Sequence, residues 1–365
     1  MISQRNAEAH PALRPLRKPL RSLRSDRKVM PNARKILFVH NALTEFVRLD
    51  LKELRKQFDV TEHFERSRLV NPAALWQQIK NHDLVFGWFA SWHTFLPLQF
   101  AKMLGKPSVL VIGGYDVANM PEIGYGHQRG GVKKWASRRT MRLATRLITN
   151  SIYSREEVAR TVGLTNDIVH TIHHGVPDRF GEFPSGLKER IALTVGNVDR
   201  SNLRRKGHEP FVRAAALLPD VKFVLVGKWK DDTIDFLRSI ATPNVIFTGR
   251  ISEVALLDSY RKASVYVQPS LHEGFGLSVA EAMLGGCVPV TTGAGALLEV
   301  TGEWGVRIRS TEARDVAEAI ESALDCSDST RMSIRSRILE QFPMENRRGQ
   351  LHELILPLMN GHGPS

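Results

Sequence analysis

Short runs rich in β-branched and aromatic residues alternate along the chain with segments whose apolar residues recur at helical spacing. The first such runs are KILFVHN, FDVTEHF, LVFGW and PSVLVI, and the helical segments between them lie near residues 45–57, 73–81 and 94–104. Strand–helix alternation with short connections is typical of parallel sheets that helices cover on both faces. The pattern therefore predicts an α/β fold with doubly wound sheets.

A break interrupts this alternation at residues 176–186, where VPDRFGEFPSG is rich in proline and glycine and has little periodicity. The alternation restarts with IALTVGN and ends in three helical stretches that reach about residue 359. Two such blocks predict two Rossmann-like domains that face a cleft, and ligands of open α/β sheets bind at the carboxyl ends of the strands. The cleft is therefore the expected active site. The expected segments are a tail at 1–34, domains at 35–180 and 187–340, and a closing helix at 341–360.

The chain is basic, with 51 Lys+Arg against 38 Asp+Glu and a formal net charge of +13. Such an excess suggests an anionic partner. Residues 1–35 hold ten basic and two acidic residues, and residues 129–146 hold seven basic and no acidic residues. The remaining 312 residues carry a formal charge of −2, so two segments account for the whole excess.

The first basic segment contains four prolines and no sustained apolar period, which is typical of a flexible tail. It lacks the apolar stretch of a secretory signal. Met30 directly precedes the first predicted strand, so residues 1–29 are also consistent with a start site assigned too far upstream. A tail that meets a membrane surface or nucleic acid is the alternative.

The second basic segment, residues 129–146, predicts a helix surrounded by cations. Its expected apolar stripe consists of Val132, Trp135, Ala136, Leu143 and Leu147. Such a helix presents either a solvated basic face or a face that meets phosphates or anionic lipid.

No run of 18 strongly apolar residues occurs, and the nearest candidate, residues 84–101, predicts a buried strand followed by a helix. The two cysteines, Cys287 and Cys326, are too few for a disulfide scaffold and fit a reducing compartment. We therefore expect a cytoplasmic protein, with peripheral contact to the inner face of an anionic membrane as an option. Nucleic acid is the less favoured partner.

The segment PSLHEGFGLSVAEAMLGGCVPVTT at residues 269–292 carries the sharpest chemical signal. Its pattern predicts a strand, a glycine turn with Glu273, and a helix that begins near Leu277 and contains Glu281. Backbone N–H groups of the turn and of the helix N-terminus then form an anion cradle. Glu281 is expected to accept hydrogen bonds from sugar hydroxyls, and Glu273 to point into the same pocket.

The segment VGNVDRSNLRRKGHEPFVRAA at residues 195–215 predicts a strand end, a cationic loop, and a helix opened by Gly207. The cations of this loop are Arg200, Arg204, Arg205 and Lys206. Cations between a strand and a helix suit a diphosphate, because Arg binds oxygens bidentately and Lys acts as a point charge.

These features together resemble the retaining, nucleotide-sugar-dependent glycosyltransferases of family 4, which have the GT-B fold. The Glu-x7-Glu signature of that family matches Glu273 and Glu281, and the Lys-Gly of its diphosphate loop matches Lys206 and Gly207. HHGVPD resembles the close of its first domain, and the helix after QFPMEN resembles the segment that crosses back to that domain. The resemblance covers most of the chain. It implies an acceptor-side first domain and a donor-binding second domain.

The resemblance also implies how the donor diphosphate is held. Lys206 and a neighbouring arginine would bind it and stabilise charge as the leaving group departs. The family's usual arginine is Asn197 here, so Arg200 or Arg205 would substitute. Transfer would retain the anomeric configuration by front-face attack, with a nucleotide-diphosphate sugar as co-substrate, no cofactor and no metal.

For the rest of the donor, the resemblance implies that Glu281 binds the ribose, that Glu273 contacts the sugar as a catalytic residue, and that residues 248–251 flank the base. The loop residues expected to contact the donor beside Glu273 are Gly274, Phe275, Gly276, Leu277 and Ser278.

The acceptor side departs from the family pattern, because GGYD at 113–116 replaces the usual histidine after the fourth strand. His93 or Asp116 would serve the acceptor, although each also suits a structural role. The expected acceptor is a hydroxyl of a glycan, a lipid-linked molecule or a phosphorylated molecule, in polysaccharide biosynthesis. The rival functions are a sugar-nucleotide 2-epimerase on the same fold and a basic module that binds nucleic acid or membrane.

Overall fold

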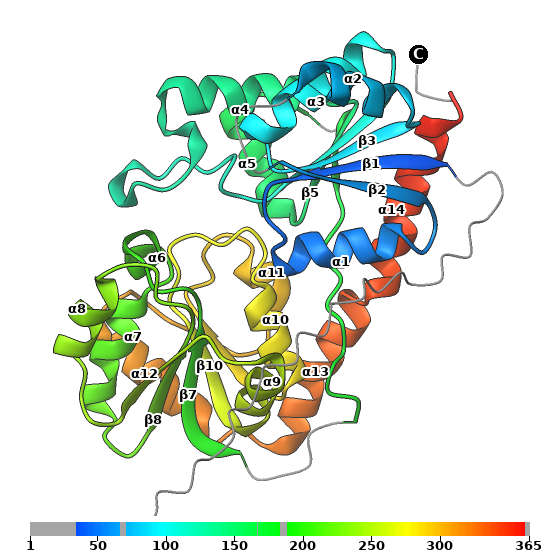
Figure 1. The fold of residues 1–365 in the computed structure, drawn as a ribbon. Helices are drawn as coiled ribbons and strands as arrows, with labels where there is room; N and C mark the ends of the chain where they lie inside the picture. Colours follow the sequence, from blue (N-terminus) through cyan, green and yellow to red (C-terminus); the bar gives the residue numbers. More distant parts are fainter. Residues whose placement is uncertain (1–33, 66–70, 166, 183–187, 362–365) are drawn as a thin grey trace, which may run out of the picture. The chain divides into compact units, whose positions relative to one another are not determined.

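A computed structural model describes residues 34–65, 71–165, 167–182 and 188–361 of the chain (Figure 1). The predicted tail therefore lies outside the described residues except for Arg34, and so do residues 183–186 of the predicted linker and residue 187 after it. The described residues from Arg34 on belong to one compact unit. Its elements follow the alternation expected from the sequence.

The first sheet has six parallel strands in the order β2-β1-β3-β4-β5-β6. Its strands are β1 (Lys35–His40), β2 (Asp59–Phe64), β3 (Leu84–Trp88), β4 (Ser108–Ile112), β5 (Arg146–Thr149) and β6 (Val169–Thr171). Its helices are α1 (Glu45–Leu54), α2 (Pro72–Lys80), α3 (Trp92–Met103), α4 (Gly131–Leu143) and α5 (Ile152–Val162), with 3-10 turns η1 (Pro121–Ile123) and η2 (His127–Arg129). The predicted strand and helix within residues 84–101 are thus confirmed as β3 and the start of α3.

Strand β1 shows how one sheet builds two cores. Ile36 and Phe38 lie in the cluster that includes residues of α1, whereas Leu37 and Val39 lie in the cluster that includes residues of α2, α3, α4 and α5. Successive side chains of a strand point to opposite faces, so a fully apolar strand buries both.

The second sheet also has six parallel strands, in the order β12-β11-β10-β7-β8-β9. Its strands are β7 (Glu189–Val195), β8 (Lys222–Val226), β9 (Val245–Gly249), β10 (Ala263–Gln268), β11 (Val288–Thr291) and β12 (Val306–Arg307). Its helices are α6 (Arg200–Arg205), α7 (His208–Ala214), η3 (Ala215–Leu217), α8 (Thr233–Ser239), α9 (Glu253–Lys262), α10 (Leu277–Leu284), α11 (Leu297–Thr301) and α12 (Ala313–Leu324). The two parallel sheets confirm the predicted α/β class with two doubly wound halves.

The last two helices belong to different cores. Ile334 and Ile338 of α13 (Asp328–Gln341) lie in the core of the second sheet. Leu351 and Ile355 of α14 (Met344–Met359) lie in the core of the first sheet, and Figure 1 shows α14 running beside that sheet. The buried guanidinium of Arg347 fixes α14 there through two hydrogen bonds of 2.5 and 2.7 Å to Asp50 of α1.

Two local expectations were wrong. The loop expected at residues 200–206 is mostly the short helix α6, because the Asp199 side chain accepts a hydrogen bond from the Asn202 N–H and caps it. The stripe expected to bury α4 is partly exposed, since the side chains of Val132 and Trp135 are 80% and 64% exposed.

The buried face of α4 instead consists of Ser137, Thr140, Met141 and Leu143. Ser137 donates a hydrogen bond to the Asp116 carbonyl (3.0 Å), and Thr140 donates to the Ala136 carbonyl (2.8 Å). Satisfied hydroxyls can be buried at low cost, so the helix buries two small polar side chains together with Met141 and Leu143, while Val132 and Trp135 stay exposed.

Candidate active site

The strand order of the second sheet reverses between β7 and β10. A crevice outside the carboxyl ends of two such strands is where an open α/β sheet binds its ligand. The cationic segment 200–206 follows β7, and the glycine loop 270–276 follows β10. The two motifs therefore lie together at the switch point.

Glu273 is the centre of a polar cluster at this point. Its Oε2 accepts a hydrogen bond from Gln268 Nε2 (2.7 Å) and lies 3.5 Å from Arg205 Nη1 and 3.8 Å from Lys206 Nζ. Burial raises the pKa of Glu273, but the two cations, His272 and the hydrogen bond together hold it below its ordinary value. The carboxylate is therefore ionised at neutral pH.

The position of Lys206 depends on the glycine that follows it. Gly207 has a φ of +69°, and a Cβ there would lie 2.3 Å from the Pro269 carbonyl oxygen at the exit of β10. Only glycine tolerates both the left-handed backbone and this approach. Burial lowers the pKa of Lys206, with Glu273 opposing and Arg205 reinforcing the effect.

Arg205 completes the cation pair. Its Nη1 donates a hydrogen bond to the His272 carbonyl (3.2 Å), and its Nη2 donates to Asn202 Oδ1 (2.7 Å). The guanidinium lies over the ring of Tyr125 in the first half, 4.9 Å from its centroid. Arg205 and Lys206 thus face one carboxylate with fixed geometry, as binding of a diphosphate requires.

Arg200 does not belong to this cluster. Its side chain is 78% exposed and pairs with Asp232 at 2.9 Å, while its backbone N–H donates to Asp231. Of the two arginines considered as replacements for Asn197, the structure brings Arg205 next to Lys206. Asn197 itself contributes its backbone carbonyl, 3.2 Å from the His208 ring.

Glu281 lies in a second cluster, on α10. Its Oε1 is 3.6 Å from Arg179 Nη1, and its Oε2 accepts a hydrogen bond from the Tyr260 hydroxyl (3.4 Å). Burial raises the pKa of Glu281 to about 7, Arg179 and the Tyr260 hydrogen bond lower it, and Glu45 and Glu253 raise it. Among the described residues, Glu281 and Glu273 share no partner.

The glycine loop lies directly against the first half of the chain. The Gly274 carbonyl accepts hydrogen bonds from Ser151 Oγ (2.8 Å) and Ser154 Oγ (3.3 Å) at the start of α5. A Cβ on Gly274 would lie 3.3 Å from the Gly113 carbonyl oxygen. The loop position thus depends on contacts that both halves supply.

The other loop residues join this packing to α10. Phe275 is buried, with its ring centroid 5.1 Å from that of His174. Gly276 has a φ of +99° and precedes Leu277, the first residue of α10. Ser278 Oγ donates to Gln268 Oε1 (3.3 Å), the side chain that also binds Glu273.

Two interactions that the sequence did not reveal connect the halves. His272 Nε2 lies 3.1 Å from Glu157 of α5, and both side chains are buried. Glu299 of α11 accepts hydrogen bonds from the first N–H groups of α5, at Ile152 (2.8 Å) and Tyr153 (2.7 Å). Neither pairing has a sequence signal, because the partners are more than 110 residues apart.

The acceptor-side candidates make contacts with backbone groups. His93 is 2% exposed, its Nε2 is hydrogen-bonded to the Trp88 carbonyl (2.8 Å), and burial lowers its pKa to about 4. Asp116 is also buried, accepts from the N–H groups of Ala90 (3.0 Å) and Gly113 (3.1 Å), and has a pKa that burial raises to about 6. Both side chains therefore shape turns at the carboxyl edge of the first sheet.

Phe89 marks the same edge and was missed in the sequence. Among the described residues it alone has a positive φ (68°) without being glycine. It follows β3, next to the order reversal between β1 and β3, and a Cβ on Gly113 would lie 2.2 Å from its ring. Backbone strain at a switch point indicates a functional edge, and a phenylalanine after a strand gives no sign of it.

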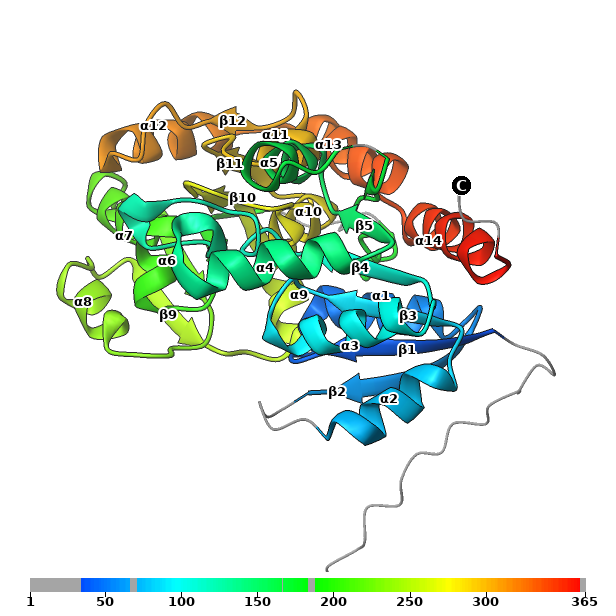
Figure 2. The same ribbon diagram turned by 90° about the horizontal axis from the view of Figure 1, so that it is seen from above.

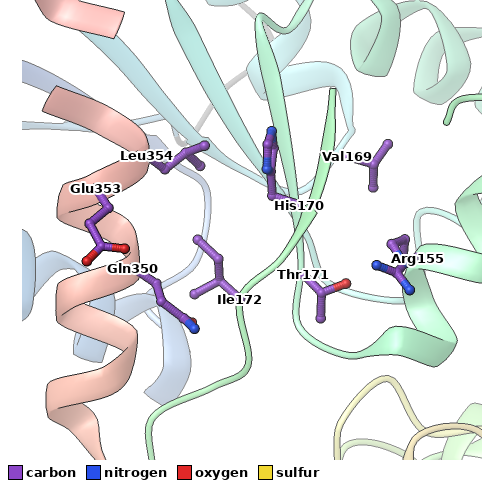
Figure 3. A pocket seen from close by; sticks show the side chains of 8 residues that line it. All are labelled: Arg155, Val169, His170, Thr171, Ile172, Gln350, Glu353 and Leu354. Atoms are coloured by element: carbon purple, nitrogen blue, oxygen red, sulfur yellow. The ribbon is translucent and has the colours of Figure 1, made fainter. Parts of the chain in front are cut away.

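A separate cavity of about 520 Å³ lies between β6, α5 and α14 (Figure 3). Its lining side chains include His170 and Thr171 opposite Gln350 and Glu353. No residue of the predicted site lines it. Within the described ranges, no cluster of three or more His, Cys, Asp or Glu side chains is arranged to hold a metal ion, and no helix is long and apolar enough to span a membrane. The metal-free site stays a prediction.

Two glycosyltransferase family models match the two halves of the chain. Residues 189–326 match the family model described as glycosyl transferases group 1, and residues 31–180 match the model described as glycosyltransferase family 4. The chain therefore belongs to this family, as its resemblance predicted.

Similar proteins agree with this placement. The chain is 31% identical over 208 residues to the GDP-mannose-dependent alpha-mannosyltransferase of Mycolicibacterium smegmatis, covering 54% of this chain and 52% of that protein. It is 30% identical over 176 residues to the lipopolysaccharide core biosynthesis mannosyltransferase LpcC of Rhizobium leguminosarum, covering 42% and 49% respectively. The chain thus spans about half the length of these relatives.

Solved structures show the fold. HepE from Anabaena, in complex with UDP and glucose, matches with a TM-score of 0.68 at 16% identity and covers 88% of this chain and 99% of its own. Sucrose-phosphate synthase from Thermosynechococcus elongatus matches with a TM-score of 0.70 at 17% identity, covering 90% and 100%. The fold is GT-B, as predicted.

Replacing Gly207 by alanine tests the close approach that positions Lys206. Gly207→Ala adds both a left-handed strain and a clash with the Pro269 carbonyl, and we expect it to lower the free energy of unfolding by about 3 kcal/mol. Gly163→Ala is the matched control, since Gly163 has a φ of +73° with open space around it, and should cost only about 1 kcal/mol. Urea denaturation measures both; equal losses would show that the approach imposes no constraint.

Proposed function

We propose that this protein transfers a sugar from a nucleotide-diphosphate sugar to a hydroxyl acceptor with retention of anomeric configuration. The observation that carries the proposal is the cluster of Lys206, Arg205 and Glu273 at the switch point of the second sheet. The buried Arg205 and the partly buried Lys206 beside a glycine loop form a preorganised site for a diphosphate, and their partners already fix their geometry.

In the reaction that we propose, the bond between the anomeric carbon and the diphosphate oxygen breaks as the acceptor oxygen bonds to the same face of that carbon. The acceptor proton passes to the departing diphosphate oxygen, and a nucleoside diphosphate leaves. Lys206 and Arg205 stabilise the charge that develops on it. Glu273, held ionised, contacts the sugar, and Glu281 accepts hydrogen bonds from the ribose.

The relatives suggest which donor to test first. Two of them are named as mannosyltransferases, one of them dependent on GDP-mannose and one acting in lipopolysaccharide core biosynthesis. We therefore propose GDP-mannose as the first donor and a glycan or lipid-linked acceptor of polysaccharide biosynthesis. HepE was solved with UDP and glucose, which makes UDP-glucose the second donor.

Charge-removing variants test the diphosphate site. We expect Lys206→Met and Arg205→Gln each to lower kcat/KM about 100-fold or more, because each removes a preorganised cation from the developing charge. Arg200→Gln should stay within about threefold, since its guanidinium is exposed and pairs with Asp232.

Initial rates with a panel of nucleotide sugars and acceptors measure these effects. A large loss in Arg200→Gln with normal Arg205→Gln would contradict the assignment. The same panel without acceptor tests the rival function, because net epimerisation of the donor without transfer would identify a 2-epimerase. A Glu273→Gln variant with the same activity as the unmodified protein would favour a basic binding module instead.

The pH dependence of donor binding tests Glu281. Burial raises its pKa to about 7, so the carboxylate accepts ribose hydrogen bonds above that pH and loses this capacity as pH falls through it. We expect the donor Kd, measured by calorimetry, to rise below about pH 7. Arg179→Met removes the cation that lowers this pKa, so its midpoint should lie at higher pH. A Glu281→Gln variant that kept the full pH dependence would contradict this role.

A further inference from the structure

The outward face of α4 combines apolar and cationic side chains. Val132, Trp135, Arg139 and Arg142 recur at the three- and four-residue spacing that lines one side of a helix, and all four are exposed. Val132 and Trp135 are 80% and 64% exposed, although both are large and apolar. We propose that this face docks on the surface of an anionic lipid bilayer.

The two helices at this face carry basic residues and no acidic residue. Helix α3, which packs beside α4 (Figure 2), has no acidic residue, and neither does the segment 129–146. Between Asp83 and Glu156 the sequence has only two acids, the buried Asp116 and the exposed Glu122. A positive surface of this extent favours an anionic partner.

The cations of α4 differ in whether groups of the protein already bind them. Arg138 and Arg142 donate hydrogen bonds to backbone carbonyls at the end of α5, at Thr161 and Val162. Lys133, Lys134 and Arg139, in contrast, form no ion pair within the part of the chain that the structure describes. Their charges are therefore not neutralised within this half.

The apolar residues distinguish a membrane from nucleic acid. The ring of Trp135 lies 6.3 Å from that of Phe95 on α3, so an aromatic pair stands at the surface beside Val132. A bilayer interface accepts aromatic rings at headgroup level, aliphatic side chains below it, and cations at the lipid phosphates. Nucleic acid would pair with the cations and stack on Trp135, but Val132 would gain nothing from its phosphates.

A cavity that Lys134 and Arg138 of the same helix help to line fits the headgroup chemistry. It has a volume of about 400 Å³, and its lining consists of polar and cationic residues. These residues are Asn119, Gln128, Lys134, Arg138, Arg160 and Thr161. Three cations and two amides around one space suit a lipid phosphate group.

Vesicle flotation of the full chain tests the proposal. We expect binding to phosphatidylcholine vesicles that contain phosphatidylglycerol, weaker binding in high salt, and little binding to phosphatidylcholine alone. Val132→Ser with Trp135→Ser should weaken binding tenfold or more, and Lys133→Gln with Arg139→Gln about fivefold per cation removed. Matched controls are Val254→Ser, at a 76% exposed valine of α9, and Lys52→Gln with Lys80→Gln, exposed lysines of α1 and α2.

A residue-specific signal accompanies the flotation. Tryptophan emission of the unmodified chain should shift to shorter wavelength on anionic vesicles, and Trp135→Phe should lose most of this shift while it still floats. Equal flotation of the α4 variants and the unmodified chain would overturn the proposal and direct attention to other basic residues. A second outcome would overturn the proposal in favour of nucleic acid. In that outcome neither the unmodified chain nor any variant binds vesicles, and the α4 variants lose binding to duplex or single-stranded nucleic acid. The readout needs no enzymatic activity, so it does not depend on the proposed transfer.

Discussion

The close approach of two chain segments at Gly207 and Pro269 is the constraint on which the candidate site depends. It brings the exits of β7 and β10 together, so that Lys206 and Arg205 face Glu273 across less than 4 Å. Each of the three charges would be unfavourable alone at this burial, and together they stay ionised. The diphosphate that we propose as ligand would bind the two cations beside this carboxylate.

Residues of the first half also hold this geometry. The Gly274 carbonyl, in the loop that carries Glu273, accepts hydrogen bonds from Ser151 and Ser154 at the start of α5. Glu299 caps the same helix. Tyr125 of the first half lies under the Arg205 guanidinium. The geometry of the candidate site in the second half is thus coupled by direct contacts to the packing of the first half.

Much of the fold and part of the candidate site could be predicted from the sequence. Fully apolar strands between amphipathic segments predicted both sheets, and glycines beside Glu273 and Lys206 predicted the turns that bring them to the switch point. The apolar periodicity alone could not identify the buried face of α4, because the Ser137 hydroxyl is buried with a hydrogen bond to the Asp116 carbonyl. Spacing could not choose between Arg200 and Arg205 either, since the choice depends on the helix that Asp199 caps. Pairings such as His272 with Glu157 join distant segments and have no local signature.

The stereochemistry of the product is the most direct test of retaining sugar transfer by this protein. After incubation of the protein with an α-configured nucleotide sugar such as GDP-mannose and its acceptor, nuclear magnetic resonance can assign the anomeric configuration of the new linkage. Retaining transfer gives an α-linked product and releases one nucleoside diphosphate for each linkage formed. A β-linked product would contradict retention, and an epimerised donor with no linkage formed would contradict transfer itself.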